Sequence, residues 1–195
     1  MVTGNLTIPP YQIIGSTVES LASNPGYMLL RETSFSASST IQITDAFGYS
    51  NYQNYSDYLI LLNCTSSVVN QYIQISFLRN TTVLGAGTYI NAGSWFYYGS
   101  GVTGNWSSTN ASGCLIGYVA APSTTNPTIG SMIVRNPLNP VETTTEQIFD
   151  MGGLYVGWGA SRYPATTSIN GFQISQQGGG NLTGSVSVFG YRTIY

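Results

Sequence analysis

The chain has 195 residues, which suits one domain with a short appendage, and only 6% of them are charged. Histidine and lysine are absent, the arginines are scattered and the net charge is −2, so the basic stripe of a nucleic-acid-binding protein is missing. A content of 42% hydrophobic and 13% aromatic residues excludes a disordered chain. Apolar runs such as residues 114–122 are too short to span a membrane.

Residues 1–26 are predicted to form an extended N-terminal arm. Pro9, Pro10 and the Asn-Pro-Gly segment at 24–26 interrupt regular structure there. Five apolar side chains nevertheless need burial, and they make up a candidate attachment arm: Leu6, Ile8, Tyr11, Ile13 and Ile14. We expect this arm to dock on a neighbouring subunit or on a larger particle.

Residues 27–195 are predicted to form one all-β domain. Ile41 and Ile43 alternate with polar neighbours, as in a half-buried strand, and the near-continuous apolar run 58–64 predicts a central strand covered on both faces. Strands are expected at 27–32, 40–46, 58–64, 71–79, 88–90, 94–98, 114–120, 130–135, 146–156, 171–175 and 182–191. This spacing predicts an antiparallel, jelly-roll-like β-sandwich made of two Greek keys.

The residue types behind most enzyme chemistry are missing. Without histidine or lysine the chain cannot build a Ser-His-Asp or Cys-His system, a Schiff base or a P-loop. Cys64 and Cys114 are too few for a zinc site, and we interpret them as small buried hydrophobic residues. The alternative, a disulfide, needs an oxidising compartment. We therefore predict no catalytic residue, no cofactor site and no metal site.

Carboxylates offer the one remaining catalytic route, because two of them can hydrolyse a glycosidic bond. The acidic residues are Glu19, Glu32, Asp45, Asp57, Glu142, Glu146 and Asp150. Spacing along the chain pairs none of them. Glu142 and Glu146 lie in a Thr-rich segment where capping and solvation explain them, so we expect a protein that is not an enzyme.

Aromatic residues are the candidate contact residues. They are Trp95, Tyr97, Tyr98, Trp106 and Trp158. One interpretation places them in the core and at a subunit interface, where rigid rings with polar tips are common. The other makes them a platform for sugar rings. A surface with so little charge is poorly protected against association, which favours an oligomer.

Several segments resemble the strands of a jelly-roll domain that recurs in bacteriophage tail-fibre and other virion-surface proteins. Segment 178–192 (GGGNLTGSVSVFGYR) is similar to its closing strand, and 169–175 (INGFQIS) to its penultimate strand. Segments 56–63 (SDYLILLN) and 71–79 (QYIQISFLR) are similar to an early strand and its successor, and 130–137 (GSMIVRNP) to a strand that leads into an Asn-Pro turn. The resemblance covers about residues 35–192.

This resemblance implies a structural protein of the virion that forms a homotrimer and has no catalytic residue. The short chain favours a capsid decoration (cement) protein that contacts the major capsid protein. The alternative is a tail-fibre or receptor-binding protein that contacts a tail structural protein and a host surface glycan. The opening residues lack the basic and apolar regions of a secretion signal, so we expect assembly in the host cytoplasm. Neither nucleic acid nor a membrane is an expected partner.

Overall fold

The computed structural model describes residues 26–48, 55–85, 88–119, 127–151 and 153–192. The proposed arm, with Leu6, Ile8, Tyr11, Ile13 and Ile14, lies outside these residues and stays a prediction. The described residues form β-strands and no helix. The strands are β1 (Gly26–Ser38), β2 (Thr40–Ile43), β3 (Asp57–Ser66), β4 (Gln71–Arg79), β5 (Thr82–Val83), β6 (Tyr89–Tyr97), β7 (Thr103–Ala111), β8 (Cys114–Val119), β9 (Thr128–Arg135), β10 (Thr143–Met151), β11 (Tyr155–Tyr163), β12 (Gly171–Gln176) and β13 (Leu182–Arg192).

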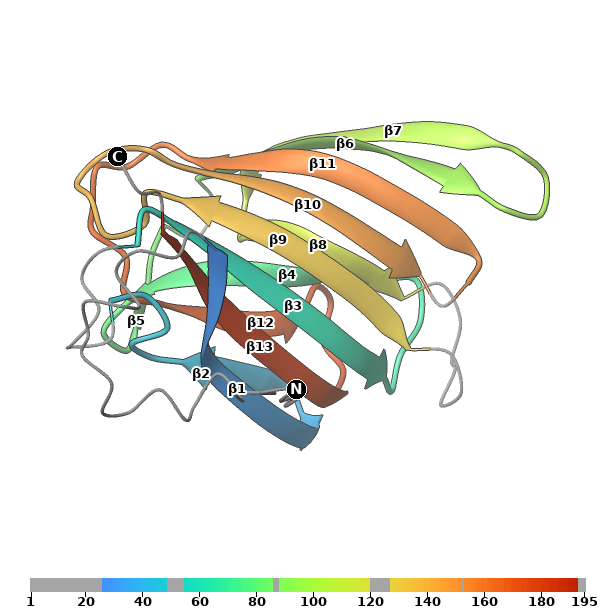
Figure 1. The fold of residues 1–195 in the computed structure, drawn as a ribbon. Coiled ribbons are helices and arrows are strands. Elements are labelled where there is room, and N and C mark those ends of the chain that lie inside the picture. Colours follow the sequence, from blue (N-terminus) through green and yellow to red (C-terminus); the bar gives the residue numbers. More distant parts are fainter. Residues whose placement is uncertain (1–25, 49–54, 86–87, 120–126, 152, 193–195) are drawn as a thin grey trace, which may run out of the picture.

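Two antiparallel sheets pack face to face (Figure 1). The large sheet has the strand order β1-β13-β3-β9-β10-β11-β6-β7. In the small sheet, β2 pairs with β12 and β12 with β4, while β5 and β8 pair with different ends of β4. The expected all-β, antiparallel architecture is confirmed.

Apolar side chains at alternate positions of the strands fill the space between the two sheets. In β3, Tyr58, Ile60 and Leu62 point inward and are almost fully buried, and in β4 Ile73 and Ile75 meet them from the small sheet. Each such side chain contributes roughly 1.5–3 kcal/mol through its burial. The expectation that Cys64 and Cys114 are buried is confirmed, and both are free thiols.

The expectation that the apolar run 58–64 is covered on both faces is wrong. β3 is central in the large sheet, between β13 and β9, but Leu61 on its other face is 39% exposed. The run is continuous because one face packs in the core and the other contributes to an apolar outer surface.

The predicted strand at 146–156 is also wrong, since a tight turn divides it. β10 ends at Met151 and β11 begins at Tyr155. Gly153 adopts a positive φ of 76°, and its N–H donates to the Asp150 Oδ1 atom at 2.7 Å. Glycine accepts this left-handed conformation without strain, and the aspartate side chain closes the turn.

Hairpin β6–β7 reaches past the edge of the small sheet (Figure 1). β6 joins two short segments that were predicted as separate strands, 88–90 and 94–98. β7 was not predicted, because its sequence TGNWSSTNA is mostly small and polar. Such a sequence is compatible with a strand at the edge of a sheet, which is where β7 lies.

Candidate binding surfaces

The structure separates the aromatic residues that the sequence singled out. Trp95, Tyr97 and Trp106 lie on the inner face of hairpin β6–β7, the face that continues into the core. Trp158 lies on the opposite, outer face of the large sheet and is 48% exposed. Tyr98 follows β6 and is also exposed.

A cleft forms where the inner face of the hairpin passes the end of the small sheet. It is lined by Tyr72 of β4, Trp95 of β6, Tyr118 of β8 and Tyr155 of β11, and encloses about 210 Å³. The rings of Tyr72 and Tyr118 lie 4.8 Å apart between centroids. Trp95 meets Tyr155 edge to face at 5.5 Å and 82°. We call these four residues the aromatic cleft.

Glycines on the neighbouring strands position the tryptophans of the hairpin. Gly104 of β7 is the cross-strand partner of Trp95, and a Cβ atom at this glycine would collide with the indole ring. Trp106 lies in the same way over Gly93 and Gly159. Glycine in a strand marks a place where another group approaches the backbone closely, here a flat ring.

Two phenol groups of the aromatic cleft, those of Tyr72 and Tyr118, stay neutral well above pH 7. Burial raises the pKa of Tyr72 and of Tyr118, and for Tyr118 the nearby Tyr72 and Tyr155 add to this effect. The Tyr118 hydroxyl lies 3.4 Å from the Asn70 Oδ1 atom and donates to it. Among the described residues, no charged side chain lines this cleft.

Sequence reasoning missed three of the four cleft residues. In the sequence, Tyr72 shares the polar side of its strand with Gln74 and Ser76, and Tyr118 and Tyr155 lie within mostly apolar segments, so none of them stands out as a binding residue. Only the pairing of β4 with β8 and of β6 with β11 brings them together. No local signal in the sequence marks that convergence.

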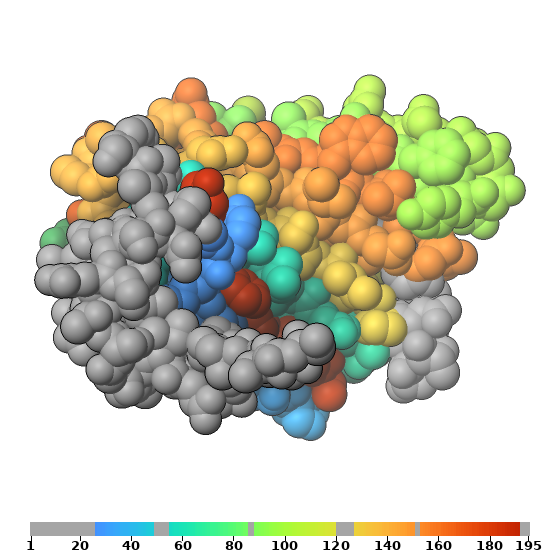
Figure 2. All heavy atoms as spheres, in the orientation of Figure 1, coloured from blue at the N-terminus to red at the C-terminus, as the bar shows by residue number. Residues whose placement is uncertain are grey.

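A second surface is the outer face of the large sheet, which is unusually apolar. Ile148 is 60% exposed, Ile129 53% and Leu61 39%, and with Trp158 they come from the adjacent strands β3, β9, β10 and β11. Leu61 is aligned through Ser131 with Ile148, and Ile148 with Trp158. The surface of these strands is continuous in Figure 2. Leu61, Ile129 and Ile148 line a groove of about 490 Å³.

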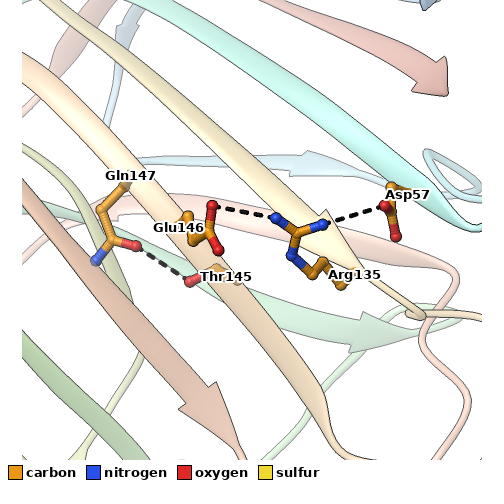
Figure 3. A network of polar contacts seen from close by, with 5 residues as sticks. All are labelled: Asp57, Arg135, Thr145, Glu146 and Gln147. Carbon is orange, nitrogen blue, oxygen red and sulfur yellow. Dashed lines mark hydrogen bonds and ion pairs between the residues drawn. The ribbon is translucent and has the colours of Figure 1, made fainter.

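Charged groups gather at one end of this outer face. The Arg135 guanidinium contacts the Asp57 Oδ2 atom at 3.3 Å and the Glu146 Oε2 atom at 3.1 Å (Figure 3). Glu142 pairs with Arg162 at 3.2 Å. Both glutamates are solvent-exposed, as expected, with side chains 38% exposed for Glu142 and 61% for Glu146, and each forms an ion pair with an arginine. Because Asp57 and Glu146 share one arginine on an open surface, they do not face each other across a substrate cleft.

Cys114 lies in a small buried polar cluster on the core side of β10 and β11. Its thiol interacts with Thr145 and Ser161, and the Gln147 amide donates to the Ser161 hydroxyl at 2.9 Å. Burial raises the pKa of Cys114 to about 12. A thiol that stays protonated and has no access to solvent is not a nucleophile.

Within the described ranges, no three His, Cys, Asp or Glu side chains are grouped closely enough to hold a metal ion. The same part of the chain has no helix that is long and apolar enough to cross a membrane. Comparisons with models of known families, with curated proteins and with solved structures found no match. The two surfaces are therefore interpreted from their geometry and chemistry.

Proposed function

We propose that this chain is a non-catalytic structural protein that assembles with copies of itself through the outer face of its large sheet. The observation that carries the proposal is the apolar surface of Leu61, Ile129, Ile148 and Trp158. Contiguous exposed apolar patches mark interaction sites in soluble proteins. Full burial of each side chain would contribute roughly 1.5–3 kcal/mol, less the part that is already covered.

The chemistry of this face suits a second copy of the same chain. Its apolar residues alternate mostly with uncharged ones such as Asn63, Ser131, Ser185 and Ser187, and Asp150 is the one charged residue in the described groove lining. In a heterologous contact this carboxylate does not meet its own copy, so like charges need not be brought together. Trp158 lies directly beside the groove, opposite Ile148. In a closed ring of three, the indole of one subunit would enter the groove of the next, a heterologous contact that closes under three-fold symmetry.

The fold that we propose is a jelly roll with two insertions. Support comes from two four-strand paths, β1-β13-β3-β9 in the large sheet and β2-β12-β4-β8 in the small one. If β5–β7 and β10–β11 are left out and the remaining eight strands are numbered along the chain, these two paths have the strand orders of a jelly roll. The segment β5–β7 is inserted between β4 and β8, and β10–β11 between β9 and β12.

Jelly rolls occur in viral capsid and lectin domains, which agrees with the resemblance to bacteriophage virion-surface proteins. The assembly that we propose is accordingly a trimeric capsid decoration (cement) protein on the outside of a phage particle. Residues 1–26 would be its attachment arm to the major capsid protein. A tail location predicts far fewer copies per particle than a capsid location, so the copy number on purified particles distinguishes the two.

Mutation of the outer face tests self-assembly. Ile129→Lys places a charge in the groove and should convert the trimer to monomers in native mass spectrometry or light scattering. Val102→Lys is a matched control, because Val102 has the same exposed fraction, 53%, but lies in the β6–β7 turn. A monomeric wild-type protein at micromolar concentration, or a trimer that persists in Ile129→Lys, would overturn the proposal.

A further inference from the structure

The aromatic cleft has a composition that the fold alone does not require. Tyr72, Trp95, Tyr118 and Tyr155 come from four strands and both sheets, and each ring is only partly buried. Side chains that only sealed the end of the sandwich would close the space between them. Here the rings leave a cavity of about 210 Å³ that is open to solvent.

We propose that this cleft binds a neutral carbohydrate, with one sugar ring held between the aromatic side chains. A sugar ring has apolar C–H faces that pack on aromatic rings and hydroxyl groups at its edge. The cleft offers both kinds of partner, because Trp95 contributes ring surface and three tyrosines contribute ring surface with hydroxyl groups. Asn70, beside the Tyr118 hydroxyl, adds an amide at the rim.

The uncharged lining of the cleft favours a neutral ligand. The lining described for the cleft contains no arginine and no carboxylate. An acidic ligand would find no counter-charge there, and a cationic one would lack a carboxylate. The raised pKa values of Tyr72 and Tyr118 keep their hydroxyl groups protonated, so these groups both donate and accept hydrogen bonds.

Size restricts the ligand further. Pockets that enclose drug-sized molecules measure about 300–1,000 Å³, which is more than this cleft holds. The cleft therefore accommodates one ring, and the remainder of a longer saccharide would continue into solvent. A proline-rich peptide also packs on aromatic rings, but an extended peptide needs a groove several residues long, and the described cleft is a single compact site.

Preorganisation strengthens this inference. Trp95 lies flat on Gly104, and Trp95 and Tyr97 both contact the Tyr155 ring, at 5.5 Å and 4.7 Å between centroids. A ring that is fixed before binding loses little conformational entropy when a ligand arrives. The cleft is on the opposite face of the large sheet from the proposed assembly surface, so the two proposals are independent and both surfaces can be occupied at once.

Titration of the full chain with saccharides tests the proposal. The probes are neutral oligosaccharides of glucose, galactose, mannose and N-acetylglucosamine, with oligogalacturonate as the acidic counterpart and decaproline as the peptide. We expect at least one neutral saccharide to bind saturably in the millimolar range or tighter, with a change in tryptophan fluorescence. Trp95→Ala should weaken this binding by about tenfold or more, the change that 1.4 kcal/mol produces.

Two further variants separate a binding role from a structural one. Gly104→Ala keeps all four rings but displaces Trp95, so it should weaken the same titration. Tyr27→Ala is the control and should leave it unchanged, because Tyr27 of β1 is 49% exposed and lines neither the cleft nor the groove. Circular dichroism confirms folding, and Tyr118→Ala replaces Trp95→Ala if the latter does not fold. The proposal is wrong if none of the neutral saccharides binds, if decaproline or oligogalacturonate binds better, or if Tyr27→Ala abolishes binding.

Discussion

The two ends of strands β6 and β11 share one sheet and one alternation, yet they have different surroundings. At the core end, Tyr89 and Tyr163 are almost fully buried, and both pack against Phe77 of the small sheet. At the hairpin end, Trp95 and Tyr155 occupy equivalent inward positions but are only partly buried. Coverage by the small sheet is what changes along these strands.

This difference shows that the same type of side chain is used where the small sheet covers the large sheet and where it does not. Under the small sheet, a tyrosine must satisfy its hydroxyl internally, and the Tyr89 hydroxyl accepts from the Phe77 N–H at 2.8 Å and donates to the Leu84 carbonyl at 3.1 Å. Beyond the small sheet, the same residue type lines a cleft that is open to solvent. Aromatic residues with polar tips serve both situations, so composition alone does not distinguish a core from a binding site.

High pH should have the largest effect on stability, and it should act on the core, where the small sheet covers the large one. Burial raises the pKa of Cys64 and Cys114 from 9.0 to about 12, and that of Tyr58 from 10.0 to about 12. The folded state therefore keeps protons that the unfolded chain releases above these lower values. Stability is full below pH 9 and is lost as pH rises from there toward 12.

Melting temperatures measured between about pH 8 and about pH 11 check this prediction. The double variant Cys64→Ala, Cys114→Ala should begin its decline about one pH unit later, where Tyr58 takes over. A wild-type melting temperature that stays constant across this range would contradict the assignment of these groups to a desolvated core.

Removal of one aromatic ring beside each end of β6 and β11 should give the next largest difference in stability. Phe77→Ala removes a fully buried ring between Tyr89 and Tyr163 and should lower the free energy of unfolding by about 3–5 kcal/mol in urea titrations. Trp95→Ala should cost clearly less, because its ring is only partly buried and lies beside an open cleft. Equal costs would mean that the hairpin end belongs to the core.

Added methyl groups sharpen the same comparison. Gly130 of β9 lies against the main chain of β8, and a Cβ atom there would collide with the Ile116 carbonyl oxygen. Gly130→Ala should therefore lower the free energy of unfolding by about 1–3 kcal/mol, the usual cost of overpacking. The three atoms nearest to a Cβ at Gly104 all belong to the Trp95 side chain, which can move toward the open cleft, so Gly104→Ala should cost less. Thermal unfolding of both variants measures the difference.

Local sequence patterns predicted which side chains face the core where apolar and polar residues alternate along a strand. The inward positions of β2 followed directly, because Ile41 and Ile43 alternate with polar residues and both are buried. Those of β3 did not, because the apolar run 58–64 shows no alternation. The outer face was not predicted, since an exposed Leu61 and a buried Leu62 look alike in sequence. The aromatic cleft was identified only through Trp95, because its other residues meet through long-range strand pairing.

The smallest expected effect concerns the ion pairs at the charged end of the outer face. Arg135 is closer to Glu146, at 3.1 Å, than to Asp57, at 3.3 Å, but the Glu146 side chain is 61% exposed and that of Asp57 only 21%. Solvent and salt screen an exposed pair more strongly than a partly buried one, so exposure outweighs the small difference in distance. Asp57→Asn should therefore destabilise the protein more than Glu146→Gln, with both changes at or below about 1 kcal/mol. Urea unfolding at low and at high salt measures both, and the cost of Glu146→Gln should shrink further as salt rises. A larger cost for Glu146→Gln would show that contact distance, and not exposure, decides the strength of these pairs.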